Sequence, residues 1–302
     1  MATLPLVRIG TRGSDLALWQ AHYLQDQLRQ QGRASELVIV QTQGDRVQDL
    51  SFDKLEGKGF FTKELEQVLL EGAVDVAVHS LKDLPTEQPT GLVLGGLSSR
   101  AAAEDQLLVL ASAHDPRQAW GLAQGARVGT SSVRRKALLH DLRPDVKSLD
   151  LRGNVPTRVA KLRSGQMDAI VLAAAGLERL ELPLDDLHVV RLDAREFVPA
   201  PAQGVLAYQC REDDDAARRM LAGIHHAPTA VVSNVERSLL RMFEGGCHLP
   251  LGAHCSVTAA GYQLVAAYAP SAGAPMRRHR LRYSTHDGLA KAMHEQLLRT
   301  QA

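Results

Sequence analysis

The chain has 302 residues, of which 45% are hydrophobic and 23% charged, and its formal net charge is +1. This length allows two or three domains with ordinary cores, and the composition is typical of a soluble globular protein. No apolar run approaches the roughly 18 residues that span a bilayer. The N-terminal residues lack the basic, apolar and cleavage segments of a signal peptide. The sequence therefore predicts a cytoplasmic protein with no membrane partner.

Short apolar strands alternate with helical patterns over the first two thirds of the chain. A strand at residues 6–10 precedes a helix at 14–32, with Ser14 as its N-cap and Gly32 at its C-terminal end. Further strands are expected at 36–42, 74–80, 126–131, 146–151 and 167–176, and helices from about Thr62, Ser132 and Pro156. This alternation predicts an α/β fold with open, mainly parallel sheets.

The composition shifts at residues 98–105 and 196–204, which we interpret as connections between domains. Two crossings indicate that the chain leaves its first domain, builds a second and returns. After about Leu221, a long helix leads to alternating segments and a final helix near His286. The predicted domains are domain 1 at 1–100, completed by 200–219, domain 2 at 104–196, and a C-terminal α+β domain at 221–302.

A faint internal repeat accompanies this organisation. Residues 8–14 (RIGTRGS) resemble residues 127–133 (RVGTSSV), and each segment ends a predicted strand and opens a helix. Residues 72–78 and 165–171 resemble each other in the same loose way. Two related α/β domains would explain the repeat.

Positive charge is concentrated between Arg127 and Arg163, where ten Lys/Arg stand against three Asp/Glu, a net charge of +7. This window contains no Phe, Trp or Tyr, which single-strand binders interleave with basic residues. A carboxylate or phosphate ligand therefore fits better than nucleic acid.

Polar residues recur where the predicted strands end, which is where open α/β sheets bind ligands. They are Arg12, Ser14, His79, Ser80, Lys82, Asp83, Thr130, Ser131, Ser132, Arg134, Arg135, Arg152, Gly153, Asn154, Arg158 and Arg179. Arginine forks and helix N-termini both bind carboxylates. We therefore favour a shared anion site over a set of solvated surface charges.

Two further features each allow two interpretations. Asp83 is the one acid among the basic loops, and it either stabilises a cation formed during reaction or shapes the turn before Pro85. Lys54 and Lys58 lie in a glycine-containing segment that is either a lid over a site or an ordinary surface loop.

The three cysteines are Cys210, Cys247 and Cys255, an odd and low count that argues against a disulfide scaffold. A zinc site made of Cys247, His248, His254 and Cys255 is disfavoured because adjacent residues chelate awkwardly. Cys210 and Cys255 suit buried positions. Cys247 follows two glycines, and a thiol on such a tight loop could carry a covalent group. No metal is predicted.

Four motifs, in chain order, resemble the porphobilinogen deaminase family, also called hydroxymethylbilane synthases. They are residues 79–85 (HSLKDLP), 129–135 (GTSSVRR), 152–158 (RGNVPTR) and 236–252 (ERSLLRMFEGGCHLPLG). The resemblance implies two periplasmic-binding-protein-like domains and a small C-terminal domain that carries a cysteine. It also implies a monomeric transferase of porphyrin and haem biosynthesis, with no nucleic-acid partner.

The reaction implied by the resemblance joins four porphobilinogen molecules head to tail, with loss of ammonia at each addition. Hydrolysis then releases linear hydroxymethylbilane. The growing chain is held on a dipyrromethane cofactor, which a thioether attaches to the position of Cys247.

The resemblance also implies residue roles. Asp83 matches the catalytic aspartate, which contacts pyrrole N–H groups and stabilises the azafulvene cation left by ammonia. The implied cofactor-binding residues are Cys247, Lys82, Asp83, Thr130, Ser131, Ser132, Arg134, Arg135, Arg152 and Gly153. The implied substrate-binding residues are Arg12, Ser14, Arg152, Arg158 and Arg179, and Lys54 and Lys58 fall in the covering loop.

The sequence departs from the family pattern at Ala202, where glycine is common, and at Leu249, where a β-branched residue is usual. Two rival interpretations stay open at this point. One is a non-catalytic anion-binding protein of the same fold, and the other is a structural protein stabilised by zinc.

Overall fold

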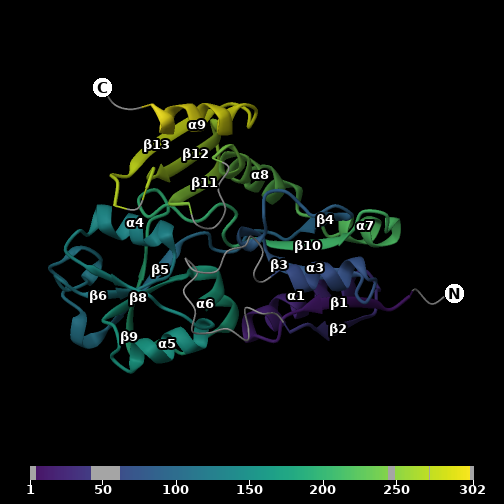
Figure 1. Cartoon of the computed structure of the whole chain (residues 1–302), viewed down its shortest axis with the longest axis horizontal. Helices are drawn as coiled ribbons and strands as arrows, with labels where there is room; N and C mark the ends of the chain where they lie inside the picture. The colour runs from purple at the N-terminus through teal and green to yellow at the C-terminus, as the bar shows by residue number, and fades with distance from the viewer. Residues whose placement is uncertain (1–4, 42–61, 244–248, 272, 300–302) are drawn as a thin grey trace. The chain divides into compact units, whose positions relative to one another are not determined.

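The computed structural model describes residues 5–41, 62–243, 249–271 and 273–299 (Figure 1). The chain divides into two compact units. The first comprises Met1–Ala101 and Val205–Ala230, and the second comprises Ala102–Gly204 and Val231–Ala302. Each unit is therefore built from two separate stretches of sequence.

The first unit contains a five-stranded sheet with the strand order β2-β1-β3-β10-β4. Its strands are β1 (Val7–Thr11), β2 (Ser35–Ile39), β3 (Val76–Ser80), β4 (Leu92–Leu97) and β10 (Leu206–Arg211). β1 pairs in parallel with β2 and β3, whereas β10 is antiparallel to both β3 and β4. Figure 1 shows the green β10 beside the blue β3 and β4, which lie far from it in the sequence.

Helices cover both faces of this sheet because its central strands are apolar on both sides. The helices are α1 (Asp15–Gln30), α3 (Lys63–Leu70) and α7 (Asp215–Ala222). Val76 and Val78 of β3 pack in one cluster with α1 and α7. Ala77, between them in the strand, packs in another cluster with α3. The alternation of side chains along β3 thus fixes which helix lies on which face.

The second unit repeats this architecture with a five-stranded sheet in the order β7-β6-β8-β5-β9. Its strands are β5 (Asp105–Leu110), β6 (Arg127–Gly129), β7 (Lys147–Leu149), β8 (Ala169–Ala173) and β9 (Leu187–Arg191). β5 is antiparallel to its described neighbours β8 and β9, whereas β6 is parallel to β7 and β8. The helices around this sheet are α4 (Val133–Leu142), α5 (Val155–Arg163) and α6 (Ala174–Leu180).

A smaller antiparallel sheet, β11-β12-β13, completes the second unit. Its elements are α8 (Ala227–Met242), β11 (Leu251–Thr258), β12 (Gly261–Tyr268), β13 (Arg277–Tyr283) and α9 (Leu289–Leu298). Leu239 of α8, Leu264 of β12 and Met293 of α9 share one buried cluster. Val265 and Ala267, on the other face of β12, pack against the core that contains Leu138 of α4.

The internal repeat suggested by the sequence corresponds to a repeated structure. Strands β2, β1, β3, β10 and β4 occupy the same positions in one sheet as β7, β6, β8, β5 and β9 in the other. Even one ion pair recurs: Arg8 Nη2 lies 2.6 Å from Asp75 Oδ1, and Arg127 Nη2 lies 2.8 Å from Asp168 Oδ1. In both pairs, the backbone N–H of the arginine also donates to the aspartate.

The predicted fold class is confirmed, with two parallel-rich sheets and a small antiparallel one. Two boundaries differ from the prediction. The apolar run at 167–176 is not one strand, because β8 ends at Ala173 and α6 begins at Ala174. The last helix begins at Leu289 rather than near His286, because Gly288 before it adopts φ +71°. The division into three domains stays a prediction.

No helix among the described residues is both long enough and apolar enough to cross a bilayer.

Candidate functional site

Arg12 and Ser14 follow β1 and open α1. Ser14 is the N-cap residue in extended conformation, and its side chain forms no capping hydrogen bond to the helix. Thr11, fully buried beside them, donates its hydroxyl to Ala17 O at 3.0 Å and so holds the start of the helix. Arg12 is half-buried. The end of β1 therefore presents a cation and a hydroxyl at a helix N-terminus, as the sequence predicted.

Lys82 and Asp83 lie in a single 3-10 turn, Leu81–Asp83, directly after β3. Leu81 and Leu84 on either side are buried, with exposed fractions of 1% and 3%. The backbone N–H of Leu81 donates to Val205 O at 2.9 Å. These anchors fix the turn while the Asp83 carboxylate stays exposed and Lys82 half-buried. Asp83 is thus an accessible charge on a rigid support.

Beneath this turn lies a buried polar chain. His79 Nε2 is 3.1 Å from Gln209 Oε1, and Gln209 Nε2 donates to Gln88 Oε1 at 2.9 Å. A longer contact of 3.4 Å joins Gln209 Nε2 to Glu66 Oε1 on α3. Burial lowers the pKa of His79 to about 4, so the ring is neutral at pH 7. His79 therefore belongs to this buried hydrogen-bonded chain and carries no charge at pH 7.

The hydroxyl groups after β6 are engaged in local structure. Ser132 Oγ caps α4 by accepting the N–H of Arg135, and Thr130 Oγ1 accepts the N–H of Ser132 at 3.2 Å. Ser131 Oγ donates to Leu151 O at 2.9 Å and accepts the N–H of Leu151 at 3.0 Å. Ser131 thereby joins the loop before α4 to the loop that carries Arg152.

Arg134 and Arg135, in the first turn of α4, are buried rather than solvated. Arg134 Nη2 lies 2.9 Å from Asp105 Oδ2, and Arg135 Nη2 lies 2.7 Å from Asp105 Oδ1. Each guanidinium also donates to a backbone carbonyl, of Val198 and Val171 respectively. Burial alone would raise the pKa of Asp105, but the two arginines outweigh it and hold that pKa well below its usual range. Asp105 is therefore ionised.

The loop before α5 is held by its own side chains. Arg158 Nε donates to Gly153 O at 2.7 Å, and Lys161 Nζ donates to Arg152 O at 3.1 Å. Gly153 has φ +109°, and a Cβ there would lie 2.6 Å from Thr157 Cγ2. Only glycine fits this position. Arg152 and Arg158 are both half-buried.

Arg179 lies in the last turn of α6 and donates from Nη2 to Gly204 O at 2.9 Å. The contacts of Ser131 with Leu151 bring two of the predicted polar segments together, the start of α4 and the loop before α5, and Arg179 belongs to the same unit. Arg12, Ser14, Lys82 and Asp83 belong to the first unit.

A family model and two curated relatives that are similar to this chain all indicate the same family. A family model described as "porphobilinogen deaminase, dipyromethane cofactor binding domain" matches residues 7–219. A relative from Syntrophotalea carbinolica named porphobilinogen deaminase is 46% identical over 253 residues, covering 83% of this chain and 78% of its own. Another of that name, from Trichlorobacter lovleyi, is 42% identical over 293 residues, covering 94% and 89%.

The chain belongs to the porphobilinogen deaminase family. Among solved structures, the periplasmic VFT2 domain of Bordetella pertussis BvgS is similar to 73% of this chain and 86% of its own, with 16% identity and a TM-score of 0.45.

The family motif at residues 236–252 is only partly described. Cys247 lies outside the described residues, as do Lys54 and Lys58. The other two cysteines are buried, and burial raises the pKa of Cys210 to about 11. No group of three His, Cys, Asp or Glu side chains suited to a metal ion occurs among the described residues. His248 also lies outside them, so metal analysis has to test the zinc alternative.

Two buried residues of this family member were missed by sequence reasoning. Asp105 is the counter-ion of both arginines, and Gln203 Nε2 donates to Asp105 Oδ1 at 2.9 Å. An aspartate that opens an apolar strand near a strongly basic window was the available signal for Asp105. No comparable signal marked Gln203.

Ala202, the departure from the family pattern, adopts φ +62° and is fully buried. Its N–H donates to Glu236 Oε2 at 2.6 Å, and Glu236 Oε1 accepts the N–H of Cys255 at 2.7 Å. Glycine adopts such a left-handed conformation more readily than alanine does.

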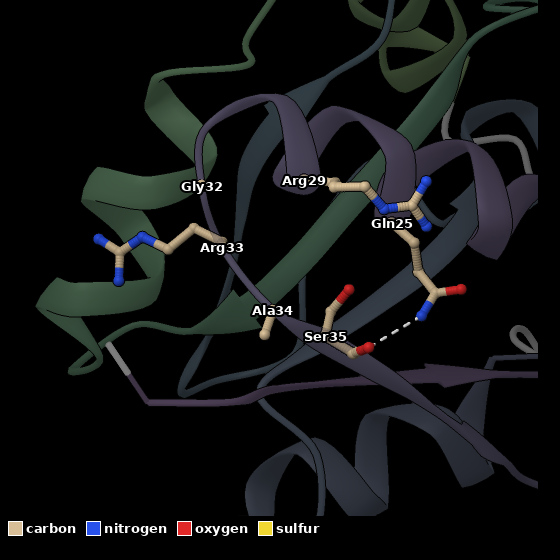
Figure 2. Close-up of a pocket in the computed structure, with 6 residues that line it drawn as sticks. All are labelled: Gln25, Arg29, Gly32, Arg33, Ala34 and Ser35. Atoms are coloured by element: carbon tan, nitrogen blue, oxygen red, sulfur yellow. Dashed lines mark hydrogen bonds between the residues drawn. The ribbon is translucent and has the colours of Figure 1, made fainter. Parts of the chain in front are cut away.

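A surface pocket of about 380 Å³ lies elsewhere, between the end of α1 and the start of β2 (Figure 2). It contains none of the predicted site residues. Arg29 already pairs with Asp26 at 2.8 Å, and the side chains of Arg29 and Arg33 point in different directions. The C-terminal end of a helix also disfavours anions. We assign no function to this pocket.

Proposed function

We propose that this chain catalyses the porphobilinogen deaminase reaction. It joins four porphobilinogen molecules head to tail, releases ammonia at each addition, and frees linear hydroxymethylbilane by hydrolysis. The observation that carries the proposal is the family match over residues 7–219, which relatives named for this activity extend over most of the chain. As part of the proposal, the enzyme works as a cytoplasmic monomer in porphyrin and haem biosynthesis, without a nucleic-acid partner.

The residues of the second unit suit a cofactor that carries carboxylates, as a dipyrromethane does. Arg134 and Arg135 share one carboxylate, so this buried group of three keeps one positive charge. Arg135 Nε is buried and has no hydrogen-bond partner among the described residues. Both arginines lie at the N-terminus of α4, where backbone N–H groups also favour anions. These features support Arg134, Arg135 and Arg152 as residues that hold the cofactor, with Thr130, Ser131, Ser132 and Gly153 shaping their loops.

When bound, the cofactor would supply the free pyrrole carbon to which the first unit is joined, and each later unit would be joined to the unit before it. The chain's own residues orient the incoming porphobilinogen and stabilise its charge. Loss of ammonia leaves a cation on that molecule, and the Asp83 carboxylate stabilises it while contacting pyrrole N–H groups. Lys82 lies beside Asp83 and binds the cofactor. Arg12, Ser14, Arg152, Arg158 and Arg179 bind substrate carboxylates, which arginine forks match bidentately.

Cys247 is the proposed attachment point, through a thioether. The burial of Cys210 and Cys255 supports this choice because a buried thiol is a poor acceptor of a bulky group. Lys54 and Lys58 are proposed to belong to the loop that covers the site.

Intact mass measurement of the purified protein tests this proposal. We expect the protein to be heavier than its sequence by two linked pyrrole units, with the added mass on the peptide that contains Cys247. Cys247→Ser should lack that mass and consume no porphobilinogen. An unmodified mass in freshly purified protein that consumes porphobilinogen contradicts the cofactor assignment. Added mass on Cys210 or Cys255 contradicts the choice of thiol.

A further inference from the structure

Asp105 is a fully buried carboxylate that two guanidinium groups share. Arg135 Nη2 is 2.7 Å from its Oδ1, and Arg134 Nη2 is 2.9 Å from its Oδ2. The exposed fraction of the Asp105 side chain is 0%, and those of the arginines are 5% and 7%. Ions this deeply buried are stable only when they are paired and hydrogen-bonded. The three side chains therefore form one unit.

A third residue fixes the orientation of the carboxylate. Gln203 Nε2 donates to Asp105 Oδ1 at 2.9 Å and to Ala103 O at 2.7 Å. Oδ1 thus accepts hydrogen bonds from an amide and one arginine, while Oδ2 forms an ion pair with the other arginine. Neither oxygen can rotate away without breaking a charged contact. Since Gln203 is itself fully buried, the whole assembly is fixed within the second unit.

The three side chains do not balance all of their positive charge among themselves, and they do not satisfy every hydrogen-bond donor. Two guanidinium ions face one carboxylate, so one positive charge is not balanced within the group. Carbonyl groups of Val198 and Val171 take one donor from each arginine. Arg135 Nε remains buried without a hydrogen-bond partner among the described residues.

We infer that Asp105 is a positioning residue for the proposed reaction: by binding both Arg134 and Arg135, it orients their guanidinium groups toward the carboxylates of the cofactor. This inference rests on the proposed function. It differs from a counter-ion role in a way that can be measured. A mere counter-ion weakens anion binding, because it cancels positive charge. A positioning residue strengthens anion binding, although its own charge is negative.

Asp105→Asn separates the two roles by the sign of its effect. The substitution keeps the size of the side chain and raises the local charge from +1 to +2. If Asp105 acted only as a counter-ion, the fraction of chains that carry the cofactor would stay the same or rise. We expect that fraction to fall at least about fivefold, because misplaced guanidinium groups lose their charged hydrogen bonds to the carboxylates of the cofactor. Intact mass gives the loaded fraction directly, without an activity assay.

The exposed Arg127–Asp168 pair in the same unit provides a matched control. Asp168→Asn removes a carboxylate from an arginine at the protein surface, and we expect its loaded fraction to equal that of the wild type. A folded Asp105→Asn protein with wild-type loading overturns the inference. Wild-type protein without the added mass instead overturns the proposed function and this inference with it.

Asp105→Asn can fail to fold, because it leaves two buried cations together. A second comparison covers that outcome. In Arg135→Gln, the charges of Arg134 and Asp105 sum to zero. In Asp105→Asn/Arg135→Gln, only Arg134 is charged, so the local charge returns to the wild-type value of +1. If Asp105 positions Arg134, the double variant loads at least about fivefold less cofactor than Arg135→Gln, despite its greater positive charge. Equal or greater loading in the double variant overturns the inference.

Discussion

The proposed role of Asp83 depends on the position of its carboxylate in the structure. The turn that carries it is anchored by buried Leu81 and Leu84, and the carboxylate itself is exposed. Its accessible charge can meet a substrate, and its side chain contributes little to the core. The two interpretations raised by the sequence, turn former and cation stabiliser, therefore predict different consequences for a substitution that keeps the shape.

We predict that Asp83→Asn folds normally and binds porphobilinogen but turns it over at least about a hundredfold more slowly. A charge that stabilises a cation formed during reaction acts mainly on the transition state, and losing one such group typically costs about 10²–10³ in rate. Steady-state kinetics give kcat, and thermal unfolding provides the control for folding. Asp83→Glu should be milder because the charge is retained. Normal turnover in Asp83→Asn contradicts the role, and a large loss of stability favours the turn former.

Between elements, the chain of His79 on β3, Gln209 on β10 and Glu66 on α3 links three parts of the first unit through buried polar contacts. The Gln209 carbonyl oxygen accepts from His79, so the ring carries its proton on Nε2 in this arrangement. Burial lowers the pKa of His79 to about 4 and raises the pKa of Glu66. Protonating the two side chains therefore has opposite effects on stability.

We predict that His79 makes the protein less stable as the pH falls from about 6.5 to 4. Over that range the unfolded chain, with a His pKa of about 6.5, binds a proton that the folded protein excludes. The difference amounts to about 3 kcal/mol at pH 4. Urea unfolding at several pH values measures it. In His79→Gln this loss should be absent, so the difference in stability between the two proteins should shrink on acidification.

The contributions of other groups cancel in that comparison, since Glu66, Asp75 and Asp168 are present in both proteins. If wild type and His79→Gln lose stability in parallel between pH 7 and 4, the neutral buried state of His79 is wrong.

At the scale of the whole molecule, the sequence predicted what local pattern determines and missed what distant contacts determine. The α/β alternation, the helix starts at Thr62 and Ser132, and the polar strand ends were all visible in short windows. The antiparallel insertion of β10 and β5 was not, because pairing between strands far apart in sequence leaves no periodic signal. Gln203 was missed for the same reason, since its partners are brought to it only by folding. The position of Asp105 at the start of an apolar strand was visible in the sequence, but its pairing with Arg134 and Arg135 was not.

The topology also makes a prediction about how the first unit folds. β10 lies between β3 and β4, yet its residues follow the whole of 102–204 in the chain. Residues 1–101 alone therefore lack an internal strand of their sheet and leave the edges of β3 and β4 unpaired. They also lose Tyr208 and Leu221 from the core that α1 covers. We predict that this fragment shows no cooperative thermal unfolding.

A fusion that joins residue 101 to residues 205–230 through a short Gly/Ser linker should restore folding. A short linker suffices because the two crossings are adjacent: Ser98 N–H donates to Leu206 O, and Leu206 N–H donates to Ser98 Oγ, both at 3.0 Å. The fusion regains all five strands and α7, so we expect a single cooperative transition by circular dichroism. Tyr208→Ala in the fusion serves as a control and should lower its Tm, since that ring is 1% exposed in the core. If residues 1–101 alone unfold as cooperatively as the fusion, β10 is not required and the discontinuous first unit is wrong.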